Sequence, residues 1–434
     1  MFAMSLAAYL KRRGIHYSWV VMATVFLTML ISSAALGLPG AFLRPLSREF
    51  GWSTGQISSA LAVRFALFGL LGPFAAIFME RYGVRRLVCM ALGLIAAGLL
   101  LATRMHALWQ LFLLWGLVLG IGSGLTALVL GATVANRWFE QRRGLVLGIL
   151  TASSATGQLV FLPVAASLIE HHGWRVAVLP VVTGCVLIAI LAFCLLRERP
   201  EDVGLIPFGA DARPDTSSAS AWRPSFSEPL KTLRSVSRSG SFWVLFGTFF
   251  VCGLSTNGLI QTHFISLCGD YGLAAVPAAS VLAMIGAFDF LGTIGSGWLS
   301  DRFDNRKLLF WYYGLRGLSL LWLPHSDFTL YGLSLFAMFY GLDWVATVPP
   351  TVKLTGAAFD RQRSAMIFGW IFAGHQLGGA TAAYGAGLTR TLLLTYSPAL
   401  YAAGLACLVA AVSIFLLPKP GDSGVSLRPA AAAA

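Results

Sequence analysis

The sequence predicts an all-α membrane protein with twelve transmembrane helices in two pseudo-symmetric six-helix bundles. Hydrophobic residues make up 57% of its 434 residues and charged residues only 11%, whereas a soluble domain carries about 25% charged residues. The apolar residues form runs long enough to cross a bilayer, which takes about 20 helical residues. Because the charges sit in short segments between these runs, the excess of 31 Lys and Arg over 18 Asp and Glu indicates membrane loops and argues against nucleic-acid binding.

Charged turns recur at a nearly constant offset along the chain. The turn Asp301–Lys307 repeats the turn Glu80–Arg86, 221 residues upstream, acid for acid and arginine for arginine. The turn Phe359–Arg363 likewise repeats Phe139–Arg143 at an offset of 220. Two unrelated turns that share an offset indicate a duplicated unit of half the chain, an internal symmetry typical of secondary transporters.

Six apolar runs in the first half each have the length of a membrane-spanning helix. Charged turns separate these runs, for example the turn at Glu80 after the second run and the turn at Arg137 after the fourth. Glycines recur at helical spacing between Gly116 and Gly124, which favours a close helix-packing face over a nucleotide-binding loop because no strand precedes them. The predicted spans are 17–43, 55–79, 87–104, 107–135, 144–169 and 174–196.

Six further runs fill the second half. The tenth span contains Pro349 and Pro350, and each proline leaves a carbonyl one turn earlier without its N–H partner. We therefore expect a kink between Tyr340 and Ala346 that includes Asp343, beside protein or a cavity. The predicted spans are 241–267, 277–299, 308–324, 328–352, 364–389 and 397–417.

The remaining segments lie outside the two bundles, which occupy 17–196 and 241–417. We expect a short interfacial helix or a frayed terminus over 1–16, a linker rich in Pro, Ser and Arg over 197–240, and a tail without regular structure over 418–434. The six cysteines lie in or beside apolar runs without metal-ligand spacing, so we expect them to pack and not to bind metal or form a disulfide framework.

Basic residues predict the orientation in the membrane. The linker, both terminal segments and the four charged turns carry most of the Lys and Arg, while the other side carries Arg44, Arg48, Arg104, Arg175 and Arg390. By the positive-inside rule, both termini and the charged turns face the cytoplasm. We therefore expect a protein that crosses the plasma membrane several times. In a bacterium this membrane would be the inner membrane.

Five charged residues away from the loops lie inside the predicted spans or directly at a span end: Arg64, Arg316, Lys353, Asp289 and Asp343. An ionised side chain in the bilayer costs at least a few kcal/mol unless it faces a cavity or a partner, so each is a functional candidate. Lys353 is the weakest candidate because it can snorkel to the end of its helix. Pairing of Asp343 with Arg316 to hold helices together is the structural alternative.

These positions supply the expected sites. Substrate binding is assigned to Arg64, Arg316, His375, Asn257 and Gln261, the last two being four residues apart on one helix and able to face one cavity. Proton coupling is assigned to Asp289, Asp343 or His375, since carboxylates and imidazoles form proton relays in membranes. The expected cytoplasmic gate, in which acids and arginines meet the neighbouring bundle only when that side is closed, comprises Glu80, Arg81, Arg85, Asp301, Arg302 and Arg306.

The turn Gly-Trp-Leu-Ser-Asp-Arg-Phe-Asp-Asn-Arg-Lys over 297–307 resembles the signature loop of the major facilitator superfamily at every defining position. The first copy departs from that pattern, with Ala76 for the glycine and Glu80 for the aspartate. The resemblance covers nearly the whole chain. It implies the major facilitator fold, with two bundles and a central cavity that opens alternately to either side.

Within that superfamily the chain resembles the monocarboxylate and oxalate/formate branch. The residues that carry this resemblance are Tyr-Ser-Trp at 17–19, Phe-Gly-Trp-Ser at 50–53, Leu-Gly-Pro at 71–73, and Arg-Trp-Phe at 137–139 with Arg-Arg-Gly at 142–144. Such transporters are expected to bind organic anions with an arginine one turn beyond an aspartate in helix 8. Asp289 matches the aspartate, but Thr293 stands at the arginine position, so Arg64 or Arg316 would supply the cation.

The sequence therefore predicts a monomeric secondary transporter of a small organic anion such as a monocarboxylate, coupled to protons or to exchange, with no cofactor or metal. One alternative is efflux of amphipathic or cationic compounds, with Asp289 and Asp343 as the cation site. A second is a non-transporting membrane sensor or assembly partner of the same fold. An enzyme is least favoured, since no nucleophile–base pair or nucleotide-binding loop stands out in the sequence.

Overall fold

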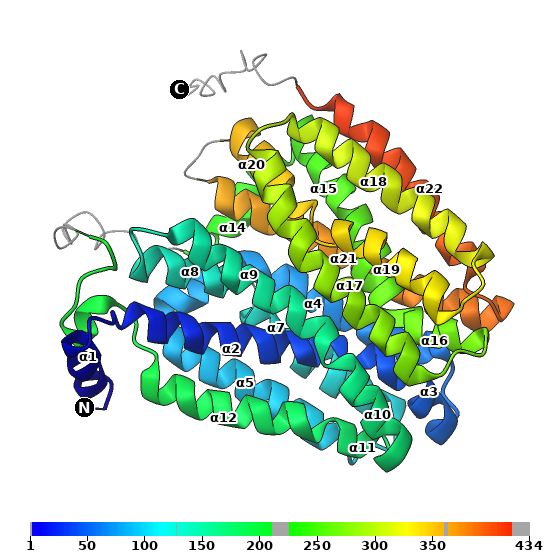
Figure 1. Cartoon of the computed structure of the whole chain (residues 1–434), viewed down its shortest axis with the longest axis horizontal. Helices are drawn as coiled ribbons and strands as arrows, with labels where there is room; N and C mark the ends of the chain where they lie inside the picture. The colour runs from blue at the N-terminus through cyan, green and yellow to red at the C-terminus, as the bar shows by residue number, and fades with distance from the viewer. Residues whose placement is uncertain (1, 127, 211–224, 360–362, 419–434) are drawn as a thin grey trace.

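The computed structural model describes residues 2–126, 128–210, 225–359 and 363–418, and these form helices joined by short turns (Figure 1). The helices of the first half are α1 (Phe2–Arg12), α2 (Ser18–Gly37), α3 (Pro39–Phe50), α4 (Thr54–Tyr82), α5 (Val84–Ala102), α6 (Leu108–Leu111), η1 (Phe112–Val118), α7 (Leu119–Leu125), α8 (Leu128–Trp138), α9 (Arg143–Val160), α10 (Leu162–His172), α11 (Trp174–Ala177) and α12 (Leu179–Leu195).

The second half repeats this helical organisation. Its helices are α15 (Gly240–Gly253), η3 (Leu254–Gln261), α16 (Thr262–Asp270), α17 (Ala275–Ser300), α18 (Asn305–Trp322), η4 (Leu323–His325), α19 (Leu330–Asp343), α20 (Val348–Ala358), α21 (Ser364–Leu393), α22 (Ser397–Ser413) and η5 (Ile414–Leu416). The linker contains η2 (Pro200–Val203) and α14 (Glu228–Val236).

Nine helical stretches among the described residues are long and apolar enough to cross a membrane. The other three predicted spans correspond to α9 with α10, to α18 and to α21. Polar residues set two of them apart, because α18 carries Arg306, Lys307 and Arg316, and α21 carries His375 and Gln376. The span formed by α9 and α10 is interrupted at Phe161. These helices still fill the places that the sequence assigned to spans.

The first span is longer than the sequence predicted. Helix α2 ends at Gly37, and α3 follows after the single residue Leu38 and continues to Phe50. The predicted end at residue 43 was therefore wrong. Arg44 and Arg48 lie on the last turns of this span and not in a loop.

The two halves pack against each other along α4 and α21. A Cβ atom added at Gly55 of α4 would lie 3.5 Å from the Gly387 carbonyl oxygen, and one added at Gly369 of α21 would lie 3.6 Å from Cα of Pro73. Figure 1 shows the first half in the lower part of the view and the second half in the upper part. We call the end that carries α1, α14 and the charged turns the termini side, and the end that carries α3, α11 and α16 the opposite side.

Parts of the predicted linker are structured and contact both halves. On the first half, the Phe208 amide donates to the Trp138 carbonyl at 2.9 Å, and the Phe208 carbonyl accepts from the Glu140 amide at 2.9 Å. On the second half, the Trp370 indole of α21 donates to the Pro229 carbonyl of α14 at 2.9 Å. These segments of the linker therefore pack against the two bundles.

The short helix expected near the N-terminus is α1. The tail over 419–434, which the sequence predicts to lack regular structure, lies outside the described residues, as do residues 360–362 of the fourth charged turn.

Candidate functional site

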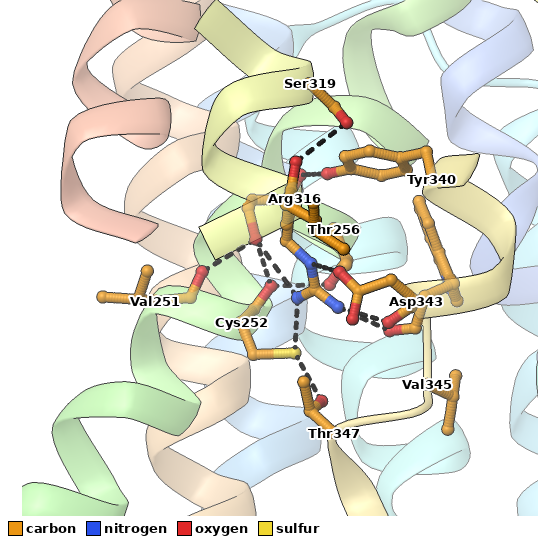
Figure 2. A network of polar contacts seen from close by, with 12 residues as sticks. Val251, Cys252, Thr256, Arg316, Ser319, Tyr340, Asp343, Val345 and Thr347 are labelled. Carbon is orange, nitrogen blue, oxygen red and sulfur yellow. Dashed lines mark hydrogen bonds and ion pairs between the residues drawn. The ribbon is translucent and has the colours of Figure 1, made fainter. Parts of the chain in front are cut away.

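A buried polar network centres on Arg316 in the middle of α18 (Figure 2). Its Nε donates to the Asp343 carboxylate at 2.7 Å, and its Nη2 donates to the carbonyls of Asp343 and Trp344. Its Nη1 donates to Cys252 Sγ at 2.9 Å and reaches Ser255 Oγ at 3.5 Å. The expected pairing of Arg316 with Asp343 is thus present, and the remaining guanidinium groups are also engaged.

The local sequence explains why carbonyls are available to Arg316. Helix α19 ends at Asp343 and α20 starts at Val348, so the predicted break is present at residues 344–347. Pro350 has no N–H for the Ala346 carbonyl, which instead accepts from Ser296 Oγ at 2.5 Å. The carbonyls at the break are therefore partly occupied by protein donors.

Asp289 of α17 lies on the same break. Its Oδ1 accepts from the Val345 amide at 2.8 Å and from Thr293 Oγ1 at 3.0 Å. Among the described residues it has no ion-pair partner, whereas Asp343 has Arg316. Thr293, at the position where the resemblance implies an arginine, thus serves as a neutral donor to the aspartate.

A second set of buried polar groups lacks partners within the described residues. Arg64 of α4 is 1% exposed, and its Nε and Nη1 have no hydrogen-bond partner. Both side-chain amide atoms of Gln261, Oε1 of Gln376 and Nδ1 of His375 are also unpaired. Buried polar atoms are nearly always bonded to protein, water or ligand, so this set indicates where a polar solute or water binds.

Helix α21 connects these groups to one another. Gly69 of α4 lies against the Gln376 side chain, and Gly258 of η3 lies against Ala382. Helix α21, which carries Gln376, therefore packs both on α4, which carries Arg64, and on η3, which carries Gln261. Because Arg64 is buried, its side chain lies inside the protein and does not extend along the lipid-facing surface.

Sequence reasoning placed Asn257 and Gln261 on one helical face, and the structure places both in η3, a segment with π-helical hydrogen bonding. Such segments are frequent at functional sites. His375 is flanked by the rings of Phe249 and Phe372, whose centroids lie 4.8 and 5.8 Å from its own. The structure thus separates the candidates into an ion-paired network around Arg316 and an unpaired set that includes Arg64.

The charged turns at Glu80 and at Asp301 each form an ion pair within their own half. Glu80 pairs with Arg137, and Asp301 pairs with Lys353. The Lys353 hydrogen bond holds the pKa of the Asp301 carboxyl below its usual range. Arg306 pairs with Asp304 at 2.9 Å and donates to the Leu417 carbonyl at 3.1 Å.

The other arginines of the expected gate lie over aromatic rings. The guanidinium carbon of Arg81 is 5.2 Å from the Phe226 ring centroid, and that of Arg302 is 4.1 Å from the Trp298 ring. Arg85 lies over Phe193 at 5.5 Å. In this structure, none of these contacts among described residues joins the two bundles directly.

Sequence reasoning missed three groups. Gln376 follows the chosen His375 directly and was detectable as a polar residue within a span. Cys252 was treated as a packing residue, although its thiol accepts from Arg316. Asp270 at the opposite side is bonded to Arg44 of the first half at 2.9 Å and to Arg390 at 2.7 Å, and only the fold brings those arginines together.

Comparison with known proteins identifies related chains over most of this length. The sequence model of the Major Facilitator Superfamily matches residues 25–383. An uncharacterised MFS-type transporter, YcxA of Bacillus subtilis, is 25% identical over 412 residues, covering 92% of this chain and 95% of that protein. Monocarboxylate transporter 13 of Bos taurus is 25% identical over 405 residues, covering 93% and 89%.

The fold itself is similar to that of a solved transporter. The crystal structure of a D-xylose–proton symporter aligns with a TM-score of 0.71 at 14% sequence identity, covering 93% of this chain and 98% of that one. With the helices described above, this similarity confirms the fold class predicted from the sequence.

Proposed function

Since the chain belongs to the major facilitator superfamily, and is therefore a transporter of the secondary type, we propose that its cargo is a small organic anion that binds at Arg64. The observation that carries this proposal is the buried guanidinium of Arg64, whose Nε and Nη1 have no hydrogen-bond partner among the described residues. Arginine stays ionised in proteins, so a buried arginine with donors that lack an acceptor favours an anionic ligand.

The chemistry of a carboxylate fits these donors. A guanidinium can hold a carboxylate through two parallel hydrogen bonds. The unpaired amides of Gln261 and Gln376 can bond further oxygens of the solute, and His375 offers one more polar atom. Arg316 is the less favoured clamp because Asp343 and three other groups already accept from it.

The similarity to a monocarboxylate transporter supports a monocarboxylate cargo. Asn257 remains a candidate contact because it shares η3 with Gln261. Asp289, Asp343 and His375 remain the candidates for proton coupling. Asp289 is the most suitable of the three, because it is 2% exposed and receives only neutral donors among the described residues.

Alternating access supplies the mechanism. Between the two bundles, Arg44 of α3 bonds to Ser266 and Asp270 of α16, and Gly55 of α4 bonds to Thr391 of α21, all at the opposite side. We assign the termini side to the cytoplasm of a plasma membrane from the basic loops. The structure then corresponds to a state held closed towards the exterior, and the charged turns would form the cytoplasmic gate in the other state. The transporter acts as a monomer in this scheme.

A cationic cargo is the second candidate, and the absence of a cation beside Asp289 in the described chain favours it. Transport by purified protein in liposomes distinguishes the two. We expect uptake of radiolabelled carboxylates such as lactate, benzoate and oxalate to depend on an imposed pH gradient and on Arg64. Uptake of lipophilic amines that survives Arg64→Ala but not Asp289→Asn would replace the anion proposal.

A further inference from the structure

A cavity of about 400 Å³ opens on the opposite side, between the two bundles. Its lining includes Arg44 and Arg48 of α3, Ser266 and Asp270 of α16, and Arg390 and Thr391 of α21. The cavity therefore lies at the other end of the protein from the charged turns. None of its lining residues belongs to the unpaired set that includes Arg64.

The charged residues of this cavity are unequal in number. The three arginines of the lining face one carboxylate, that of Asp270. Arg44 Nη2 donates to Asp270 Oδ1 at 2.9 Å, and Arg390 donates from Nε and Nη2 at 2.7 and 3.0 Å. Arg48 is exposed and has no ion pair with the described residues. The cavity keeps a positive excess that an anion can neutralise.

The same contacts hold the two halves together. Arg44 belongs to the first half and also donates to the Ser266 carbonyl at 3.1 Å, while Arg390 belongs to the second half. Beside them, the Gly55 amide of α4 donates to Thr391 Oγ1 at 2.9 Å. An anion that replaced Asp270 as the partner of Arg44 would therefore weaken a link between the bundles.

Gly269 lies directly beside the guanidinium of Arg44. A Cβ atom at position 269 would overlap the Arg44 guanidinium, so a larger residue there would displace this side chain from its present place. The site is thus built from both bundles and from a backbone position that admits the arginine.

We propose that this cavity is a second binding site for small organic anions, in which the ligand's carboxylate takes the place of Asp270 on Arg44 and Arg390. The ligand occupies it on its way to or from Arg64, and its binding weakens the cross-bundle contact by removing the Arg44–Asp270 ion pair. This site rests on the proposed anion cargo. The anion replaces Asp270 as the partner of Arg44 and Arg390, so few contacts are gained and its affinity is modest. Its binding acts directly on the contact that closes the opposite side.

The test uses a single reporter thiol in the cavity. Ser47 lines the cavity, and Ser47→Cys in phosphatidylcholine nanodiscs is labelled with the small neutral reagent N-ethylmaleimide, with the wild-type chain as the blank for native thiols. Lactate, benzoate and oxalate should slow labelling of the new thiol, and the corresponding amides should not. In Arg44→Gln and Arg390→Gln the half-protecting concentration should rise about tenfold, as expected for the loss of one charge-assisted contact.

Matched variants separate this site from the central one. Arg64→Ala should leave protection unchanged, and so should Arg104→Gln, which removes an exposed arginine from another cavity of the same side. Equal protection by amides, or protection that depends on Arg64 and not on Arg44, would overturn the second site. Slow labelling in phosphatidylglycerol discs without any carboxylate would assign the cavity to lipid headgroups and also overturn it.

The two proposals fail in different ways. Protection of the thiol without carboxylate uptake in liposomes would contradict the proposed cargo but retain the cavity as an anion site. Carboxylate uptake that depends on Arg64, with no protection by any anion tested, would contradict the cavity site alone.

Discussion

Arg316 of α18 bonds Asp343 twice, from Nε to the side-chain carboxylate at 2.7 Å and from Nη2 to the main-chain carbonyl. The second bond is possible because α19 ends at Asp343 and its last carbonyls lack helical partners. One side chain thus neutralises a buried charge and also completes the hydrogen bonding of a broken helix. This arrangement predicts a structural role for Arg316 and leaves Arg64 for the ligand.

Removing the Asp343 charge should destabilise the protein. Asp343→Asn leaves Arg316 buried without a counter-ion, and breaking such a pair costs about 3–5 kcal/mol. Thermal unfolding in detergent should show a lower melting temperature. The double variant Arg316→Met with Asp343→Leu should recover much of that loss, because no buried charge remains. A single variant as stable as the wild type would mean that water reaches the pair.

Arg64 should control substrate affinity without controlling folding. Arg64→Ala should weaken carboxylate binding by about 2–4 kcal/mol, and Arg64→Lys by less, because lysine supplies charge without the two-pronged geometry. Uptake kinetics in liposomes measure the effect, and size-exclusion profiles check folding. Arg104→Ala, at an exposed position, is the matched control. Near-normal affinity in Arg64→Ala would move the clamp to Arg316.

Proton coupling should depend on a buried carboxylate. We expect Asp289→Asn to lose the dependence of uptake on an imposed pH gradient while it retains exchange of substrate across the membrane, because the amide cannot carry a proton. Asp343→Asn tests the second carboxylate in the same assay. If both variants kept their dependence and His375→Gln lost it, the histidine would be the proton carrier.

The contact between α15 and α21 should not tolerate a methyl group. A Cβ atom at Gly253 would overlap the His375 carbonyl, so Gly253→Ala should destabilise the protein by about 1–3 kcal/mol. The change should also displace His375. Gly247→Ala on the same helix is the control, since a Cβ there has no neighbour within 4 Å. Equal melting temperatures of the two variants would show that the helices separate easily.

The Asp301–Lys353 pair should not make transport depend on pH between 5 and 8. Lys353 lowers the pKa of the Asp301 carboxyl, so the stabilisation is present above the ordinary aspartate pKa of about 3.9 and disappears only as the pH falls through the lower, folded-state value. Asp301→Asn should therefore change access of thiol reagents from the termini side by the same factor at pH 5.5 and pH 7.5. A factor that differed between these pH values would contradict this assignment.

Glu80→Gln provides the companion test in the first half, where Glu80 pairs with Arg137. If the charged turns stabilise closure of the termini side in the outward-open state, each of the two variants should increase that access. Unchanged labelling in both would count against a gate at these turns.

The sequence by itself determined the fold class and the number of spans, since both follow from local properties. Runs of apolar residues reveal helices because a backbone in lipid must satisfy its own hydrogen bonds, and the repeated turns at Glu80 and Asp301 reveal two halves. The break around Asp343 was also local, because Pro349 and Pro350 act one turn away. Hydropathy alone identifies α18 and α21 as membrane spans less clearly, because these helices carry polar residues that lie inside the protein.

Only the tertiary structure decided which charges have partners. Arg64 and Arg316 look alike as single cations within apolar runs, yet one is unpaired and the other is bonded to Asp343 across 27 residues of sequence. Asp270 joins Arg44 and Arg390 from 226 and 120 residues away. Electrostatic interactions and hydrogen bonds depend on distance in space, which hydrophobic periodicity does not encode, so the sequence could supply the candidate residues but not their partners.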